Sequence, residues 1–360
     1  MPRFVKELFI GEGSFGSVYS GSFQDDNNRK VALKFENKPS TTDDSHSQLR
    51  HEYKVYKELH QHGKVYHHHH YRHHYYITNN CSYQVNGFAK QIYYGPSSNG
   101  NLLILDLLGP SLSQLLDRCS GTFSLKTVIQ IADQTLKRLE SLHSRNIIHR
   151  DIKPDNFCLG LHDNQIYCLD LGLATLYISK TSNKHKPYCD HKSLVGTPRY
   201  ASINAHDGIR YGRRDDLMSL SFMLIYLLKG SLPWQGVKIS EKEKKYNQIS
   251  HLKKTITPAK LCEDIPQEFA KLLQYCKDLK YDDKPNYLYL RNMFQDLYEE
   301  NNYHLCNNSY WCWQDNDDSE QEIHTSNEVS FNDDCNLLKR KQTFDDVIVN
   351  NNVNNKRIKR

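Results

Sequence analysis

A short polar run near the middle of the chain carries the side chains best suited to chemistry. The run spans His149 to Asn156 and contains Asp151, Lys153 and Asn156, and Asp170 follows it. The Asp151 carboxylate could accept a proton from a hydroxyl, and the Lys153 ammonium group could neutralise a phosphate. Asn156 and Asp170 offer the oxygen ligands that Mg²⁺ prefers. The set therefore predicts metal-assisted transfer of a phosphoryl group to a hydroxyl.

The spacing of this run matches the catalytic loop of protein kinases. Asp170-Leu171-Gly172 stands where kinases hold metal with an Asp-Phe-Gly triplet, with Leu in place of Phe. The apolar residues 166–169 predict a strand that returns Asp170 to the loop after a turn around residues 162–164. Taken alone, an Asp-x-Lys-x-x-Asn run could be an ordinary charged loop. Motifs elsewhere in the chain decide between the two interpretations.

A glycine-rich turn near the N-terminus is the second motif. Its G-x-G-x-x-G pattern also occurs in dinucleotide-binding folds, where a helix follows the glycines at once. Here residues 17–23 alternate small or polar with larger side chains, which predicts a strand instead. A turn between two strands fits a lid over nucleotide phosphates, because glycine permits close approach of the backbone. The residues predicted to contact ATP here are Gly11, Glu12, Gly13, Ser14, Phe15, Gly16 and Val18, with Val18 against the adenine.

A lysine and a glutamate are expected to complete the nucleotide site. Lys34 ends a Val-Ala-Leu-Lys strand, which resembles the kinase strand whose lysine contacts the nucleotide phosphates. An apolar stripe predicts a helix over residues 48–60. Glu52 lies beside this stripe and is the expected partner of Lys34, with Glu58 as the rival acid. The adenine pocket and the hinge after it are predicted to involve Ala32, Leu105, Asp106 and Leu108.

The second half of the chain is predicted to be mostly helical. Ser111 and Ser124 are capping residues that each precede a helix. A run from Asp216 is apolar nearly all round and predicts a central buried helix that Gly230 ends. Asp216 is expected to accept N–H groups from the catalytic loop. The last two helices are predicted over residues 267–279 and 285–298.

Several further motifs give the chain a resemblance to the casein kinase 1 family. Most distinctive is Ser202-Ile203-Asn204, which stands where most kinases have Ala-Pro-Glu. The resemblance covers about residues 8–298, and it implies an α+β, bilobal protein-kinase fold with a β-rich small lobe and a helical large lobe. It also implies a serine/threonine kinase that uses ATP and Mg²⁺. The other matching stretches are Leu107 to Leu112, His149 to Phe157, Gly196 to Asn204, Gly212 to Leu217 and Gly230 to Gly236.

The same resemblance implies a substrate preference. The family favours protein substrates with an acidic or phosphorylated residue upstream of the target. It does not usually need phosphorylation of its activation loop, here residues 173–195, although this loop holds several hydroxyl side chains. Besides Leu171 in the metal triplet, the departures from the family pattern are Glu12 in the glycine loop and Pro198 in the substrate region. The residues that match the family's anion site are Lys192, Arg199, Gln235, Gly236 and Lys245.

The motifs also divide the chain. A His- and Tyr-rich insertion over about residues 60–86 interrupts the small lobe; we interpret it as a loop, with metal binding as the alternative. The tail is rich in Asn and Asp and is predicted to be disordered. The expected parts are an N-terminal arm at 1–8, a kinase domain at 9–298 made of a small lobe at 9–105, a hinge at 106–109 and a large lobe at 110–298, and a tail at 299–360.

The tail carries two further hypotheses. Its basic clusters at 339–341 and 356–360 resemble nuclear-import signals, although solubilising charge is an equal alternative. Ser319 follows several aspartates and could be an autophosphorylation site that then occupies the anion site.

Composition limits the partners. Net charge is +5 and the ten cysteines contain no C-x-x-C pair, which fits a reducing compartment. The longest apolar run, residues 222–228, is too short to span a bilayer, and the first residues lack the apolar core of a signal peptide. We therefore expect a cytoplasmic or nuclear monomer that acts on proteins, without nucleic acid or membrane. The alternatives are a non-catalytic scaffold that keeps the fold and a kinase of the vaccinia-related group.

Overall fold

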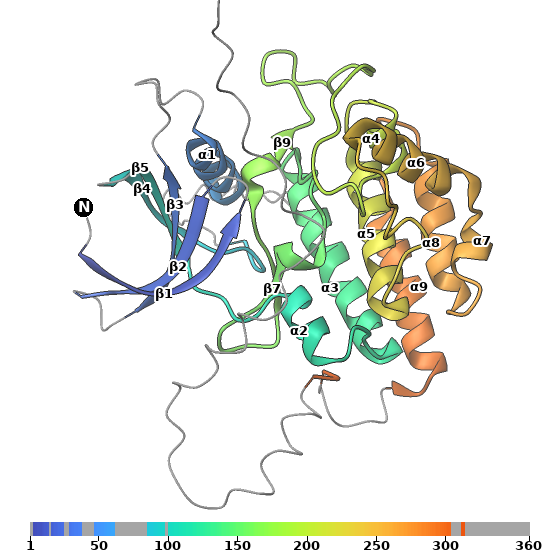
Figure 1. Ribbon diagram of the computed structural model, residues 1–360, viewed down its shortest axis with the longest axis horizontal. Helices are drawn as coiled ribbons and strands as arrows, with labels where there is room; N and C mark the ends of the chain where they lie inside the picture. The colour runs from blue at the N-terminus through green and yellow to red at the C-terminus, as the bar shows by residue number, and fades with distance from the viewer. Residues whose placement is uncertain are drawn as a thin grey trace, which may run out of the picture. The chain divides into compact units, whose positions relative to one another are not determined.

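A computed structural model describes residues 3–13, 16–24, 29–37, 47–61, 85–97, 100–303 and 311–313. Strands dominate its N-terminal part and helices its C-terminal part (Figure 1). This is the predicted α+β class with a β-rich small lobe and a helical large lobe. In the described ranges no helix combines the length and the apolar character needed to cross a bilayer.

The small lobe is built on one antiparallel sheet of five strands. Its order is β1-β2-β3-β5-β4. The glycine motif forms the tight connection between β1 and β2, where Gly13 lies opposite Gly16, so the predicted strand–turn–strand arrangement is confirmed. A Cβ at Gly16 would lie 1.8 Å from the Phe35 carbonyl oxygen, so glycine is required there. The strands are β1 (Phe4–Gly13), β2 (Gly16–Phe23), β3 (Lys30–Asn37), β4 (Gln91–Ser97) and β5 (Gly100–Asp106).

The sheet starts earlier than the sequence indicated. We expected an arm over residues 1–8, but β1 begins at Phe4. Val5 pairs with Ser22 and Lys6 with Gly21 in the β1–β2 ladder, which brings these residues into the lobe. The stretch contains polar residues because β1 is the edge strand and most of its side chains are exposed.

Each face of the sheet belongs to a different core. Val31, Leu33 and Ile104 pack in a small cluster of the sheet alone, whereas Leu103 and Leu105 join the main core. Because directly opposed residues share a face, Val18, Ala32, Lys34 and Leu105 all project toward the same side. The predicted nucleotide contacts of the sheet are therefore on one surface.

Helix α1 (Gln48–Gln61) confirms the predicted helix and its apolar stripe. Leu49, Tyr56 and Leu59 are buried in the main core. Ser47 precedes the helix and caps it, since its hydroxyl accepts a hydrogen bond from the Arg50 N–H at 3.1 Å. Glu36 of β3 supports the same end: it accepts from the Gln48 N–H at 2.7 Å and from the Ser47 hydroxyl at 2.5 Å.

The large lobe surrounds helix α5, which is buried along almost its whole length. Ser111 and Ser124 cap α2 and α3 as predicted, and Gly230 ends α5 in a left-handed conformation with φ 72°. The catalytic loop is carried by four short strands and two single-turn helices. The strands are β6 (Ile147–Ile148), β7 (Phe157–Leu159), β8 (Ile166–Cys168) and β9 (Thr175–Leu176), and the helical turns are Pro154–Asn156 and Leu171–Leu173. The helices are α2 (Leu112–Arg118), α3 (Leu125–Ser144), α4 (Ile203–His206), α5 (Arg213–Lys229), α6 (Lys242–Thr255), α7 (Pro258–Leu261), α8 (Gln267–Asp278) and α9 (Tyr287–Glu300).

The predicted disordered tail begins too early. We placed it at residue 299, but α9 continues to Glu300, and residues 311–313 pack on the large lobe. Trp311 and Trp313 are 3% and 6% exposed and stack with ring centroids 4.8 Å apart. Trp313 also lies 5.2 Å from Phe123, so aromatic burial outweighs the polar composition around it. The rest of the tail, with Ser319 and both basic clusters, lies outside the described residues.

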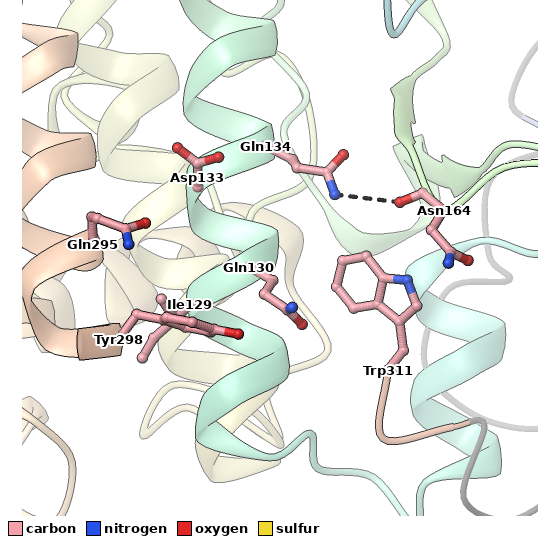
Figure 2. A pocket seen from close by; sticks show the side chains of 8 residues that line it. All are labelled: Ile129, Gln130, Asp133, Gln134, Asn164, Gln295, Tyr298 and Trp311. Carbon is pink, nitrogen blue, oxygen red and sulfur yellow. Dashed lines mark hydrogen bonds between the residues drawn. The ribbon is translucent and has the colours of Figure 1, made fainter. Parts of the chain in front are cut away.

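Trp311 also borders a pocket of about 300 Å³ between α3 and α9 (Figure 2). Gln130, Gln134 and Asn164 give it a polar lining, and Gln134 donates to the Asn164 carbonyl oxygen at 3.3 Å. None of the predicted ATP or catalytic residues lines this pocket.

Candidate active site

The catalytic loop is held by the buried helix α5, through hydrogen bonds from the loop backbone to Asp216. The carboxylate of Asp216 accepts from the His149 N–H at 2.7 Å and from the Arg150 N–H at 2.9 Å, as predicted. Burial raises the pKa of Asp216, but the hydrogen bond from His143 holds this pKa below its usual value. Asp216 is therefore a charged anchor, and the loop conformation depends on it.

The turn that returns Asp170 to this loop is formed by two short strands. β7 (Phe157–Leu159) pairs with β8 (Ile166–Cys168), as the sequence predicted. His149 adds a second link, because its Nε2 lies 2.9 Å from the Leu169 carbonyl oxygen.

Asp151 is held by donors on both carboxylate oxygens. Oδ1 accepts from the backbone N–H of Thr197 at 2.9 Å and from its hydroxyl at 2.8 Å. Oδ2 lies 3.2 Å from the Lys153 Nζ and 3.3 Å from the Asn156 Nδ2. The three residues predicted to be catalytic are thus brought together. Thr197 was not predicted as a site residue.

Lys34 joins the two lobes through a pair of carboxylates. Its Nζ lies 2.7 Å from Glu52 Oε2 and 2.9 Å from Asp170 Oδ1. Burial lowers the pKa of Lys34, but the two carboxylates raise this pKa above its usual value, so the amine is a cation. Glu52 is confirmed as its partner, and the rival acid Glu58 pairs with Lys180 instead.

Asp170 sits at the start of a single helical turn. Its φ is 55°, a left-handed conformation that a residue other than glycine adopts at a cost. Burial raises the pKa of Asp170, but Lys34 has the opposite effect. On balance the pKa lies below its usual value, and the carboxylate stays ionised. Leu171 is fully buried and keeps the apolar packing of the Phe it replaces, while the Gly172 carbonyl oxygen accepts from Gln48 of α1.

Asp170 and Asn156 fit a bound magnesium ion. The amide nitrogen of Asn156 donates to the Asp151 carbonyl oxygen at 2.7 Å, which leaves the amide oxygen as its metal ligand. Among the described residues, no cluster of three or more His, Cys, Asp or Glu could hold a metal by itself. Two oxygen ligands match a cation that nucleotide phosphates and water complete.

The structure describes all but two of the predicted nucleotide residues. Gly11, Gly13 and Gly16 frame the β1–β2 turn, and Ser14 and Phe15 lie outside the described residues. Ala32 and Leu105 face each other across β3 and β5. The remaining members occupy their expected strands or the hinge: Glu12 in β1, Val18 in β2, Asp106 at the end of β5 and Leu108 after it.

The Asp106 side chain has a structural task. Its carboxylate pairs with Arg29 at 2.6 Å and accepts from the Lys90 N–H at 3.0 Å. These contacts fix the end of β5 and occupy the carboxylate, so Asp106 has its backbone left for an adenine.

The residues of the predicted anion site come from separate segments of the large lobe. Trp234 Nε1 donates to the Arg199 carbonyl oxygen at 2.7 Å, which connects Arg199 to the loop of Gln235 and Gly236. Lys192 donates its N–H to Gly208 after α4, and Lys245 lies in α6. The grouping of these two lysines with Arg199 remains a prediction.

A buried lysine, not predicted from the sequence, holds the segment that carries Thr197. Lys253 of α6 donates from its Nζ to the carbonyl oxygens of Pro198 at 2.8 Å and Ala201 at 2.6 Å. It is 2% exposed and lies over the Phe222 and Trp234 rings. The sequence shows this residue only as one lysine in a basic helix, so nothing in the pattern singled it out.

Most of the histidine insertion lies outside the described residues, and so does its metal-binding alternative. His60 is described: its ring nitrogens lie 3.3 Å from the Ala89 carbonyl oxygen and 3.3 Å from the Val85 nitrogen. It closes the end of α1 against the following chain.

A family model of the protein kinase domain matches residues 4–295. The chain belongs to the protein kinase family. Its match begins at the first residue of β1, and it includes every described residue of the site. Membership of this family implies that the kinase takes its phosphoryl group from ATP.

Proposed function

We propose that this kinase phosphorylates serine and threonine in proteins and is of the casein kinase 1 type. One observation carries the choice of hydroxyl: Thr197 donates both its backbone N–H and its hydroxyl to the Asp151 carboxylate. The backbone that leads to the substrate region is therefore in direct contact with the proposed base.

The residue before Thr197 strengthens this argument. Gly196 has φ 84°, and a Cβ there would lie 2.3 Å from the Arg150 carbonyl oxygen. The two segments are too close for any side chain to separate them. A substrate that rests on this surface has its backbone near Asp151, which suits the short side chains of serine and threonine better than tyrosine.

The roles of the residues follow from their charges. Bound MgATP supplies the phosphoryl group and a cation that offsets its negative charge. Asp151 accepts the proton of the attacking hydroxyl, and Lys153 stabilises charge on the transferring group. Lys34, oriented by Glu52, would hold the nucleotide phosphates, and Asp170 and Asn156 would hold the magnesium ion.

The Ser-Ile-Asn motif supports the proposed subfamily. Ser202 and Asn204 both donate to Asp215 Oδ1, at 2.7 and 3.0 Å. The other oxygen of Asp215 accepts from the Gly212 N–H at 2.7 Å. Ser202 and Asn204 of the motif therefore bond to Asp215 of the Arg-Arg-Asp-Asp run, so the two stretches contact each other directly.

The preference for acidic or phosphorylated substrates rests on Arg199. Its guanidinium group lies over the Tyr200 and Tyr226 rings, with centroid distances of 5.8 and 5.7 Å. Stacking of this kind orients a guanidinium for bidentate contact with phosphate. Gln235 and Gly236 lie on the loop that Trp234 joins to Arg199.

The first experiment uses three peptides that differ only in the target residue: serine, threonine or tyrosine. We expect phosphate transfer to serine and threonine alone, with loss of transfer in Asp151→Asn. Equal transfer to tyrosine would contradict the proposal. Transfer to none, with Asp151→Asn identical to the parent, would favour the scaffold.

The second experiment compares one peptide with and without a phosphoserine three residues before the target. We expect the primed peptide to have the higher kcat/KM, and Arg199→Ala to remove most of the difference. Arg199→Lys should retain part of it, and Lys260→Ala, an exposed lysine of the large lobe, all of it. Equal rates on the primed and unprimed peptides would contradict this substrate preference. Equal rates on a histone-type basic substrate and on the primed peptide would favour the vaccinia-related alternative.

We further propose protein substrates as the partners, a monomeric state, and residence in the cytoplasm or the nucleus. The basis is composition, together with the two basic clusters of the tail.

A further inference from the structure

Two cysteines far apart in the sequence lie side by side in the large lobe. The Sγ atoms of Cys119 and Cys312 are 3.8 Å apart, although the residues are separated by 193 positions. Both side chains are thiols in the structure and both are partly exposed. Four other described cysteines, Cys158, Cys168, Cys262 and Cys276, are buried.

Each thiol is held in place by its own backbone. Cys119 directly follows α2, and its N–H donates to the carbonyl oxygens of Leu115 and Leu116. Cys312 lies between the two buried tryptophans, and its N–H donates to the Thr127 hydroxyl at 3.1 Å. The sulfur contact is therefore part of the packing of residues 311–313 on the lobe. A disulfide needs the sulfur atoms to approach to about 2 Å, which is a movement of the order that side-chain rotation can supply.

We propose that Cys119 and Cys312 form a reversible disulfide, with a low-molecular-weight disulfide such as oxidised glutathione as the oxidant. One protein thiolate attacks the glutathione disulfide, forms a mixed disulfide and releases one glutathione. The second protein thiolate then attacks the protein sulfur of that mixed disulfide and releases the second glutathione. Two protein thiols are oxidised, one glutathione disulfide is reduced to two thiols, and the two protons leave with them.

The bond would join two parts of the lobe that are otherwise held by packing. It ties the segment after α9 to the end of α2, and α2 contacts the single-turn helix Pro154–Asn156 of the catalytic loop. A cross-link between residues so far apart removes many conformations of the unfolded chain. The oxidised kinase should therefore resist heat more than the reduced kinase, with its active site unchanged.

The test uses the full-length kinase equilibrated with oxidised glutathione, then alkylated, digested and analysed by mass spectrometry without reduction. We expect a peptide pair that contains Cys119 joined to Cys312, which dithiothreitol removes. The same oxidation should raise Tm by about 5 °C. Cys119→Ser and Cys312→Ser should each abolish the peptide pair and the shift, and Cys189→Ser, the matched control at a partly exposed thiol, should keep both.

Three results would overturn the proposal. One is cross-linking of Cys119 to a different cysteine, within the chain or between two copies. Another is stable glutathione on both residues without the bond between them. The third is a Tm shift that persists undiminished in Cys119→Ser.

Discussion

At the level of single residues, the site depends on how completely its charges are paired. Asp151 has donors on both oxygens, and Lys34 lies between two carboxylates. Asp151, Lys34 and Glu52 are little exposed. Hydrogen bonds are stronger in the protein interior than in water, so these charged groups are held firmly in position. Thr197 is the partner that the sequence did not reveal.

Removing the Thr197 hydroxyl should therefore disturb the base without unfolding the protein. We expect Thr197→Val to lower kcat by about tenfold, since one hydrogen bond to a charged group contributes about 1.5 kcal/mol or more. Steady-state kinetics at saturating ATP measures this. Thr197→Ser keeps the hydroxyl and should stay within about twofold of the parent, because the same bond can form. An unchanged kcat in the valine variant would remove Thr197 from the site.

A second prediction concerns His206, which contacts Lys253. Burial, and then the nearby Lys253, lower the pKa of His206 to about 3 from its usual 6.5. Between these values the unfolded chain binds a proton that the folded chain does not, so stability falls as pH drops below 6.5. We expect a loss of about 1 kcal/mol between pH 7 and 5.5 that His206→Gln lacks. Urea unfolding of both proteins at the two pH values gives the difference, and parallel pH dependence would contradict it.

At the level of elements, β3 orients α1 as well as carrying Lys34. Glu36, two residues after Lys34, binds Ser47 and Gln48 at the first turn of α1. Glu52 lies one turn further along this helix. The lysine and its partner are therefore positioned by the same pair of elements.

Glu36→Ala should loosen this arrangement. Loss of a helix-capping contact costs about 1 kcal/mol, so we expect kcat/KM for ATP to fall about fivefold. Glu58→Ala is the control, because Glu58 is on the same helix and pairs with Lys180 near its other end. Equal losses in both variants would show that the start of α1 has no special role.

The segment 197–201 is the second element that needs support. Lys253→Met removes the donor to Pro198 and Ala201 while keeping a long apolar side chain. We expect the KM for a peptide to rise about tenfold, with the KM for ATP within about twofold, because substrate positioning is sensitive to small displacements. Lys254→Met is the matched control, since the neighbouring Lys254 forms an ion pair with Asp207 at the surface. A rise in both KM values would point to general unfolding instead.

The sequence predicted most of what positions the site. Local motifs identified Lys34, Asp151 and Asp170, because spacing along one element is visible in the chain. Helix periodicity placed Glu52 beside the apolar stripe, and the family resemblance favoured it over Glu58. Thr197 and Lys253 were missed because their roles depend on contacts between distant segments. The start of β1 was missed because an edge strand lacks the apolar pattern of a buried one.

At the level of the whole molecule, the large lobe extends beyond its last long helix. Residues 311–313 cover Phe123 and the start of α3, and their two tryptophans are buried. Composition averaged over the tail hid them, since two aromatic side chains contribute little to a window of Asn and Asp. Their burial alone is enough to fix the segment.

A chain ending at residue 303 should therefore be less stable than one ending at 314. We expect its Tm to be lower by at least about 5 °C, because each buried tryptophan contributes several kcal/mol. The chain ending at 314 should match the full-length protein. Equal Tm values for the two truncations would contradict a structural role for residues 311–313.

The positions of the three tryptophans have an optical consequence. The sequence contains only Trp234, Trp311 and Trp313, and all of them belong to the large lobe. Trp234 donates to the segment after Thr197, and the other two form a stacked pair on α3. Intrinsic tryptophan emission from this kinase therefore reports on the substrate segment and on the C-terminal packing. Nucleotide-induced changes in the glycine-rich turn call for a label placed in the small lobe.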